Sequence, residues 1–432
     1  MSERQGQGVD RRLAPAALAT LATSAILATL AAGCASVRAD RAIAVASGSV
    51  SQTICSGTFV SGLDPERVYA ETMRPQPGMG LVDWALRYDV DRERGEVRTT
   101  VAGGFASRAI HRDGLGCVLV HEAEPALPSE TFRTAEAAVG PATPVEPANE
   151  ALRAALDRAF VETEGEPPLG TTAVVVLHEG RIVGERYAPG YGVATSIPGN
   201  SVTKSVVDAL IGILVRQGRI VADRPAPVKA WSDPRDPRHA ITVEELLRMT
   251  SGLPFDEEQG GWDASSRMWF LEPDMAAFAE KAELDAPPGT TWAYSDGGYS
   301  ILARIIRDAV GGHPDDVIRF VRDELLRPVG MQHTVLESDS TGTPIGSRAM
   351  LASARDWARF GQLYLDDGVA GGRRILPEGW VRAASTQTLD TGYGAGFWIN
   401  VVQGGEVPVW GIPWGMPGAP RDAFFGRGYL GQ

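Results

Sequence analysis

Ser201 and Lys204 are the two residues whose types and spacing most directly suggest catalysis in this chain. They belong to the stretch Ser201-Val202-Thr203-Lys204, which follows a Pro-Gly-Asn turn and opens an apolar run of helical spacing that stops at Gly218. Residues three apart on a helix share a face, so the lysine amine can reach the serine hydroxyl. A serine becomes a useful nucleophile beside a base, and a helix N-terminus favours the negative charge it acquires. The spacing therefore predicts an activated serine at the head of a helix.

The alternative interpretation is a serine helix cap followed by a solvated lysine. The chain contains three lysines, Lys204, Lys229 and Lys281, and arginine carries nearly all the remaining positive charge. A merely solvated position would more often have been arginine. The four residues alone are still a weak signal, because such short motifs recur by chance.

A second stretch, Pro287 to Asp296, strengthens the first because it contains Tyr294 in the sequence Tyr-Ser-Asp. Together the two stretches resemble the serine β-lactamase and penicillin-binding-protein superfamily, most closely its class C-like esterase and 6-aminohexanoate-dimer hydrolase branch. The resemblance covers roughly residues 150–432 in the expected order. Further matching stretches are Leu246 to Leu253, Gly297-Gly298-Tyr299 and Ala354 to Gly361.

The resemblance implies an α+β fold of the β-lactamase/transpeptidase type, in which an antiparallel sheet flanked by helices packs against an all-helical lobe. The hydrolase domain would span residues 150–432, with the lobe at about 232–345. Residues 35–140 read as a separate small β-rich region, because short apolar runs alternate with Gly- and Asp-rich turns. Residues 141–149 read as a linker.

Local patterns predict several elements of the hydrolase domain. Asn149 is expected to cap a helix that buries Leu152 and Leu156, and Thr242 to open another helix through a capping box. Residues 171–177 and 181–187 read as a β-hairpin around Glu179-Gly180. Helical periodicity dominates from 242 to about 326 and returns at 354–365, and the late segments 395–402 and 423–430 read as strands.

The resemblance also assigns catalytic roles. Ser201 would form an acyl-enzyme, Lys204 would hold its hydroxyl, and Tyr294, matching the family's Tyr-x-Asn element, would pass the proton to the leaving group. Taken alone, Tyr294 reads as a turn tyrosine packed beside Trp292. Asp296 departs from the usual asparagine, and an ionised carboxylate there would keep Lys204 charged and shift the role of base to Tyr294.

The family's third element, Lys-Thr-Gly or His-x-Gly, falls at Tyr429-Leu430-Gly431. Tyr429 replaces the cation that helps to hold a substrate carboxylate in β-lactamases, which argues for an ester or uncharged amide, although Arg427 could supply charge instead. The oxyanion hole would use the backbone N–H groups of Ser201 and Gln432. Members of the family continue past this point with further strands and a C-terminal helix that covers the sheet, so the resemblance implies that a chain ending at Gln432 is a truncated product.

The N-terminus reads as an export signal over residues 1–34, with Arg11 and Arg12 before an apolar core. Leu30 to Cys34 resembles a lipoprotein processing site, and the alternatives are ordinary signal cleavage or a retained membrane anchor. Of the three cysteines, Cys55 and Cys117 would pair in an oxidising periplasm or cell envelope, leaving Cys34 for lipidation. Two free buried thiols are the other interpretation. Multiple acylation of Cys34 would anchor the chain to a membrane.

The composition narrows the partners further. A net charge of −13 argues against nucleic acid and anionic membrane surfaces, and the six scattered histidines give a metal site little support. No cofactor is implied, and nothing indicates an oligomeric state. Three hypotheses remain: a serine hydrolase of esters or small linear amides, a D,D-peptidase or β-lactamase acting on cell-wall peptides or penicillins, and a non-catalytic binding protein that retains the fold.

Overall fold

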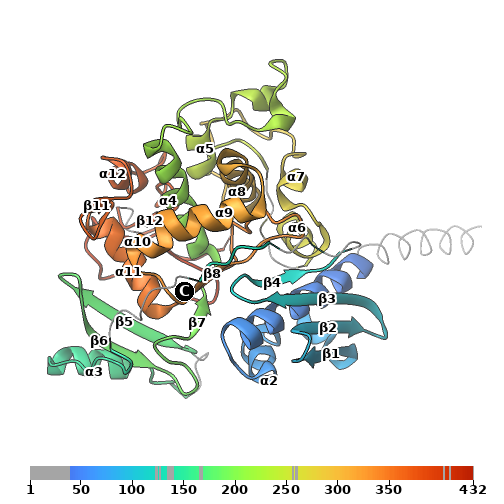
Figure 1. Cartoon of the computed structure of the whole chain (residues 1–432), viewed down its shortest axis with the longest axis vertical. Coiled ribbons are helices and arrows are strands. Elements are labelled where there is room, and N and C mark those ends of the chain that lie inside the picture. The colour runs from blue at the N-terminus through green and yellow to red at the C-terminus, as the bar shows by residue number, and fades with distance from the viewer. Residues whose placement is uncertain are drawn as a thin grey trace, which may run out of the picture.

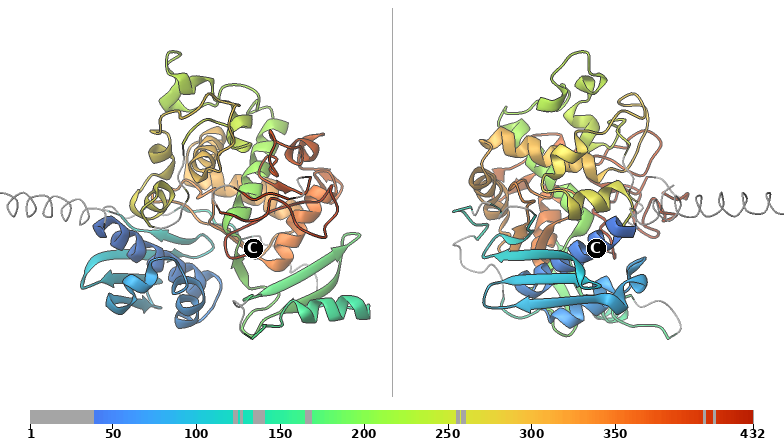
Figure 2. Two further views of the ribbon diagram at one scale, coloured as in Figure 1. Left: turned by 180° about the vertical axis from the view of Figure 1, so that it is seen from behind. Right: turned by 90° about the vertical axis from the view of Figure 1, so that its right-hand side faces the viewer.

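The computed structural model of the chain describes residues 39–431, apart from residues 122–124, 126–127, 134–140, 165–168, 255–256, 258–260, 402–403 and 408–409. The export signal, Cys34 and Gln432 therefore lie outside the described residues. The ribbon has three parts: a module at the N-terminus, a hairpin with one helix, and a larger helical body (Figure 1). The chain end lies where these parts meet, in both further views as well (Figure 2).

The N-terminal module, residues 39–121, combines a long helix with an antiparallel sheet. The sheet has four strands in the order β1-β2-β3-β4. The helix, Ala39–Val60, ends in a π-helical turn and contributes Val50 and Ile54 to a core separate from that of the helical body. The bounds of the other elements are α2 Pro65–Val68, β1 Leu86–Asp91, β2 Glu96–Val101, β3 Gly104–Arg112 and β4 Gly116–Leu119.

The disulfide predicted from cysteine parity is present and ties this helix to the sheet. Cys55, on the helix, is bonded to Cys117, on β4, and both residues are fully buried. The helix was not predicted, because its apolar residues are interrupted by serines and threonines. It is long and apolar enough to cross a membrane by length and composition, but 61% of that stretch is buried inside the protein. A buried core helix passes the same test, so this is weak evidence for a membrane span.

The hairpin and its helix form as the sequence predicts. Asn149 caps α3 (Glu150–Arg158) by accepting a hydrogen bond from the Leu152 N–H at 3.0 Å. Strands β5 (Ala173–His178) and β6 (Arg181–Tyr187) pair antiparallel. Glu179 and Gly180 between them both have positive φ, of 50° and 72°, as a two-residue hairpin turn requires.

A buried ion pair fixes this hairpin to the helical body. Arg355, in the first turn of α11 (Ala354–Leu365), donates two hydrogen bonds of 2.8 Å to the carboxylate of Glu185 on β6. The same guanidinium donates to the Pro141 and Thr143 carbonyls of the linker, and Tyr187 donates to Glu185. A bidentate pair with its remaining donors satisfied is the geometry in which a buried charge pair is tolerated.

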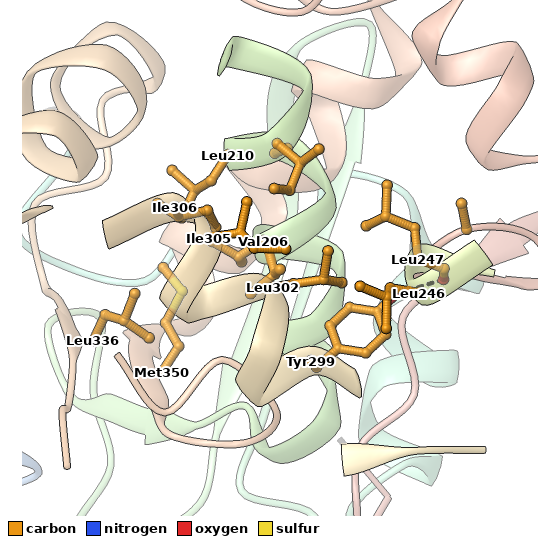
Figure 3. Close-up of a cluster of buried hydrophobic side chains, with 14 of the residues drawn as sticks. Val206, Leu210, Leu246, Leu247, Tyr299, Leu302, Ile305, Ile306, Leu336 and Met350 are labelled. Atoms are coloured by element: carbon orange, nitrogen blue, oxygen red, sulfur yellow. Dashed lines mark hydrogen bonds between the residues drawn. The ribbon is translucent and has the colours of Figure 1, made fainter. Parts of the chain in front are cut away.

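The helical body is organised around α4 (Thr203–Arg216) and α8 (Asp296–Val310), which pack against each other (Figure 3). Val206 and Leu210 of α4 meet Leu302, Ile305 and Ile306 of α8, all of them buried. Thr242 opens α5 with the predicted capping box. The other helices are α5 Val243–Leu247, α6 Ala264–Leu271, α7 Met275–Ala279, α9 Pro314–Val321, α10 Arg327–Val329 and α12 Trp380–Ala384.

Strands in this body are short. A three-stranded sheet has the order β7-β9-β8 and lies beside the start of α4. The late segments predicted as strands are mostly irregular, because β12 and β13 pair over two residues each. The bounds are β7 Ser196–Pro198, β8 Thr334–Leu336, β9 Met350–Ser353, β10 Val369–Ala370, β11 Arg373–Arg374, β12 Trp398–Ile399 and β13 Phe424–Phe425. The mixture of helices and antiparallel sheets confirms the predicted fold class.

Asp208 in the middle of α4 makes the stability of this body depend on pH. It is fully buried, and its Oδ2 accepts hydrogen bonds from Tyr364 and Trp380, whereas its Oδ1 has no partner among the described residues. Burial raises its pKa from 3.8 to about 7. The unfolded chain therefore releases this proton near pH 4 while the folded chain keeps it, so folding stability falls as the pH rises from about 4 to about 7.

We expect Asp208→Asn to unfold at higher denaturant concentration than the parent at pH 8, with a gain of about 1–3 kcal/mol. Asparagine keeps the two accepted hydrogen bonds and carries no charge. The gain should shrink as the pH falls towards 4, where the aspartate is protonated in both states. Chemical denaturation at pH 4.5, 6 and 8 measures this trend. A gain that is equal at all three pH values would contradict the assignment.

Candidate active site

Ser201 is held by a constrained turn at the head of α4. Its neighbour Asn200 has a positive φ of 45°, and the Asn200 side chain donates to the Tyr429 carbonyl at 2.8 Å. A Cβ on Gly199 would lie 2.2 Å from the Trp357 ring, so the chain needs glycine there. Ser201 itself lies in a 3₁₀ turn, Asn200–Val202, that runs directly into α4. The predicted position at a helix head is confirmed.

Lys204 is buried, and each of the three N–H groups of its ammonium has a hydrogen-bond acceptor. Its Nζ donates to Ser201 Oγ at 3.0 Å, to Asp296 Oδ1 at 2.5 Å and to the Ser347 carbonyl at 2.9 Å. The side chains of Lys204 and Asp296 are each 1% exposed. An ammonium group has three donors and no acceptor. Lys204 is therefore arranged to hold the serine hydroxyl as a cation, and it has no free lone pair with which to remove a proton.

Tyr294 completes the group that the sequence analysis predicted. The Lys204 Nζ lies 4.6 Å from the centre of its ring, and its phenol is hydrogen-bonded to the Ser201 side chain. Burial, and then the charges of Glu257 and Asp296, raise the pKa of Tyr294 well above its ordinary value. The phenol therefore keeps its proton at neutral pH. This favours a relay, in which the phenol accepts the serine proton as it donates its own, over a phenolate that acts as the base.

Glu257 is a site residue that the sequence did not reveal. It is 3% exposed, and its Oε1 accepts a hydrogen bond from the Asp296 backbone N–H at 2.5 Å. Burial, and then the charge of Asp296, raise its pKa well above the ordinary value for a carboxyl group. Burial and the neighbouring carboxylate thus favour the neutral form of Glu257, and Asp296 Oδ1 is the carboxylate oxygen that accepts from Lys204. No pattern could have found it, because the acidic run 256–258 reads as a solvated loop.

The charge of Asp296 should be visible in the pH dependence of catalysis. Asp296→Asn removes a negative charge that raises the pKa of Tyr294. The Tyr294 phenol should then lose its proton more readily, so we expect the basic limb of the kcat/KM profile to move about one unit to lower pH. Initial rates on a p-nitrophenyl ester between pH 5 and 10 measure the limb. An unchanged profile would mean that Asp296 does not control the proton relay.

Residues of the third predicted element lie beside Ser201 but add no cation. Tyr429 is 41% exposed, and its hydroxyl donates to Gln76 Oε1 of the N-terminal module at 2.7 Å. Gly431 lines the same cavity as Ser201, and Gln432, the predicted second oxyanion donor, lies outside the described residues. Arg427 stacks on the rings of Trp398 and Phe425 and donates to a backbone carbonyl, so its charge is engaged within the fold.

The cavity that Ser201 opens into has a volume of about 2110 Å³ and is lined by all three parts of the protein. Among the described residues, no group of His, Cys, Asp and Glu side chains is arranged to hold a metal ion. The N-terminal module contributes one wall and is anchored through Glu337. This buried carboxylate accepts hydrogen bonds from Gln52, Ser56 and the Cys117 N–H. The disulfide thus lies next to the contact that sets this wall.

Comparison with known proteins agrees with this geometry. The family model described as Beta-lactamase matches residues 156–431. The chain is 28% identical over 316 residues to penicillin-binding protein 4 of Amycolatopsis lactamdurans, covering 62% of this chain and 77% of that protein. It is 26% identical over 263 residues to the 6-aminohexanoate-dimer hydrolase of Paenarthrobacter ureafaciens, covering 56% of this chain and 64% of that protein.

A solved structure shares the fold. It is a protein of Bacillus anthracis assigned as a 6-aminohexanoate-dimer hydrolase, with a TM-score of 0.51 and 24% identity, covering 65% of this chain and 71% of that one. The family model begins at residue 156, so its match falls on the hairpin and helical body, after the N-terminal module.

Proposed function

Because the chain belongs to the β-lactamase family, whose members are serine acyl-transfer hydrolases, we propose that it hydrolyses esters or small linear amides through an acyl-enzyme on Ser201. The observation that carries the proposal is the contact of Lys204 Nζ with Ser201 Oγ at 3.0 Å inside a buried, charge-balanced pair with Asp296. An ammonium held in this way lowers the cost of the developing alkoxide.

The proposed reaction has two halves. Ser201 Oγ attacks the substrate carbonyl as its proton moves to the Tyr294 hydroxyl, which gives its own proton to the leaving alcohol or amine. Lys204 remains a cation throughout and stabilises the charge that develops on the serine oxygen. Water then attacks the acyl-enzyme by the reverse proton path. The Ser201 N–H and the N–H of Gln432 are the proposed oxyanion donors, and loss of one such donor costs about 3 kcal/mol.

Esters and linear amides are preferred over β-lactams because of the third element. Tyr429 stands where the family resemblance predicts a cation, and its hydroxyl is engaged by Gln76. The relative named 6-aminohexanoate-dimer hydrolase supports a linear amide as one substrate class. The relatives named penicillin-binding protein 4 and D-alanyl-D-alanine-carboxypeptidase/endopeptidase support the alternative, a peptidase or β-lactamase.

Stopped-flow measurement of p-nitrophenol release from a short acyl ester tests the proposal. We expect a burst equal to the amount of enzyme in the parent and none in Ser201→Ala. Turnover of nitrocefin at a comparable kcat/KM would favour the β-lactamase alternative. Ester hydrolysis that persists in Ser201→Ala would remove the proposal altogether.

A further inference from the structure

Arg348 directly follows Ser347, which contacts Lys204, and it lines the same cavity as Ser201. The carbonyl of its neighbour Ser347 accepts the third hydrogen bond of Lys204, at 2.9 Å. The Ser347 hydroxyl is itself fixed by Trp269 Nε1, which donates to it at 3.1 Å. The backbone at this position is therefore held at a defined distance from the proposed nucleophile.

The guanidinium of Arg348 rests on two aromatic rings. Its Cζ lies 4.8 Å from the centre of the Trp269 ring and 5.0 Å from that of Phe270. Within the described part of the chain, the side chain takes part in no hydrogen bond or ion pair, although a guanidinium offers five N–H donors. Burial lowers the pKa of Arg348, and the charges of Asp296 and Glu337 oppose that effect.

The neighbouring carboxylates are committed elsewhere. Asp296 is paired with Lys204, and Glu337 accepts from Gln52 and Ser56 of the N-terminal module. From a distance, the charges of these two carboxylates favour the cationic form of Arg348. Neither carboxylate accepts a hydrogen bond from the guanidinium of Arg348. A planar cation stacked on two rings on the wall of a cavity, with a fork of donors that no described residue uses, is arranged for bidentate binding of an anion.

We propose that Arg348 binds a carboxylate on the substrate, so that the enzyme acts on esters or linear amides that carry a free carboxyl group. This rests on the proposed function for the chemistry at Ser201. A singly charged anion fits better than a phosphate dianion, because the nearby charges of Asp296 and Glu337 oppose a second negative charge. The overall charge of −13 acts in the same direction.

Two matched pairs of esters test the proposal kinetically. p-Nitrophenyl glutarate and p-nitrophenyl valerate differ by a carboxylate on the acyl side, and 3-carboxyphenyl valerate and phenyl valerate differ by one on the leaving group. We expect Arg348→Gln to raise KM by about 10- to 100-fold for the charged member of one pair and to change the neutral members less than about 3-fold. Arg348→Lys should raise KM for the same charged ester by less than Arg348→Gln does. Arg235→Gln, which removes the same charge from the surface, should leave both pairs unchanged.

A binding measurement separates this proposal from the proposed function. In the full chain carrying Ser201→Ala, titration calorimetry should detect monomethyl glutarate, which carries one carboxylate, with binding weakened at least 10-fold by Arg348→Gln and no competition from inorganic phosphate. Failure of all ester hydrolysis together with Arg348-dependent binding of monomethyl glutarate would overturn the proposed function and keep the carboxylate site. Ester hydrolysis without any selective effect of Arg348→Gln, or binding of phosphate in place of monomethyl glutarate, would overturn the carboxylate site alone.

Discussion

Lys204→Met is expected to lower kcat/KM for ester hydrolysis by at least about 10³-fold. The variant removes the cation that holds Ser201 Oγ and that stabilises the alkoxide, and effects of this size are typical for a group that stabilises charge in the transition state. Methionine fills much of the volume of the buried lysine. Steady-state rates on p-nitrophenyl butyrate measure the loss, and a decrease below 10-fold would contradict the role assigned to Lys204.

Loss of folding must be separated from loss of chemistry in this variant. Breaking a buried ion pair by removing one partner typically costs about 3–5 kcal/mol, because the other charge is left uncompensated. The double variant Lys204→Met/Asp296→Asn removes both charges and should recover most of that stability in denaturant unfolding. Its activity should stay as low as that of Lys204→Met. Recovery of activity along with stability would show that Lys204 acts only on the fold.

Tyr294→Phe is expected to lower kcat/KM by about 10²- to 10⁴-fold, the usual range for removal of a general acid–base group. The ring contacts with Trp398 and Trp410 remain, so the free energy of unfolding should change by less than about 1 kcal/mol. A relay through the phenol predicts a further result. The loss should be larger for an alkyl ester or an amide, whose leaving group needs a proton, than for a p-nitrophenyl ester.

That comparison of leaving groups is the control for Tyr294. Matched rates on p-nitrophenyl butyrate and ethyl butyrate are sufficient to make it. Equal losses on both substrates would indicate that the phenol positions Ser201 and does not carry the proton. No loss on either would return Tyr294 to the role of a packed turn tyrosine.

Local sequence patterns predicted the elements whose signal lies within a few residues. The capping residues Asn149 and Thr242 act as expected, and so does the turn at Glu179-Gly180. The spacing of Ser201 and Lys204 fixed their contact, because three residues on a helix head allow few other arrangements. Each of these features depends on short-range geometry, which a single sequence states directly.

Features that depend on distant segments were not predictable in the same way. Glu257, which accepts from the Asp296 backbone N–H, comes from a loop with no periodic pattern. Docking of the N-terminal module depends on Glu337, which lies 220 residues from Cys117, whose N–H it accepts. The segments around β12 and β13 were predicted to be longer strands. In the structure, aromatic residues there pack against one another, and the two strands pair over two residues each. Packing between remote segments decided all three.

The most direct test of the account is to label the full chain with a fluorophosphonate probe and to locate the adduct by peptide mass spectrometry. We predict one adduct, on Ser201, that is absent in Ser201→Ala and forms at least about 10²-fold more slowly in Lys204→Met. An adduct on a different serine, or a folded protein that remains unlabelled, would contradict the claim that Ser201 is the nucleophile.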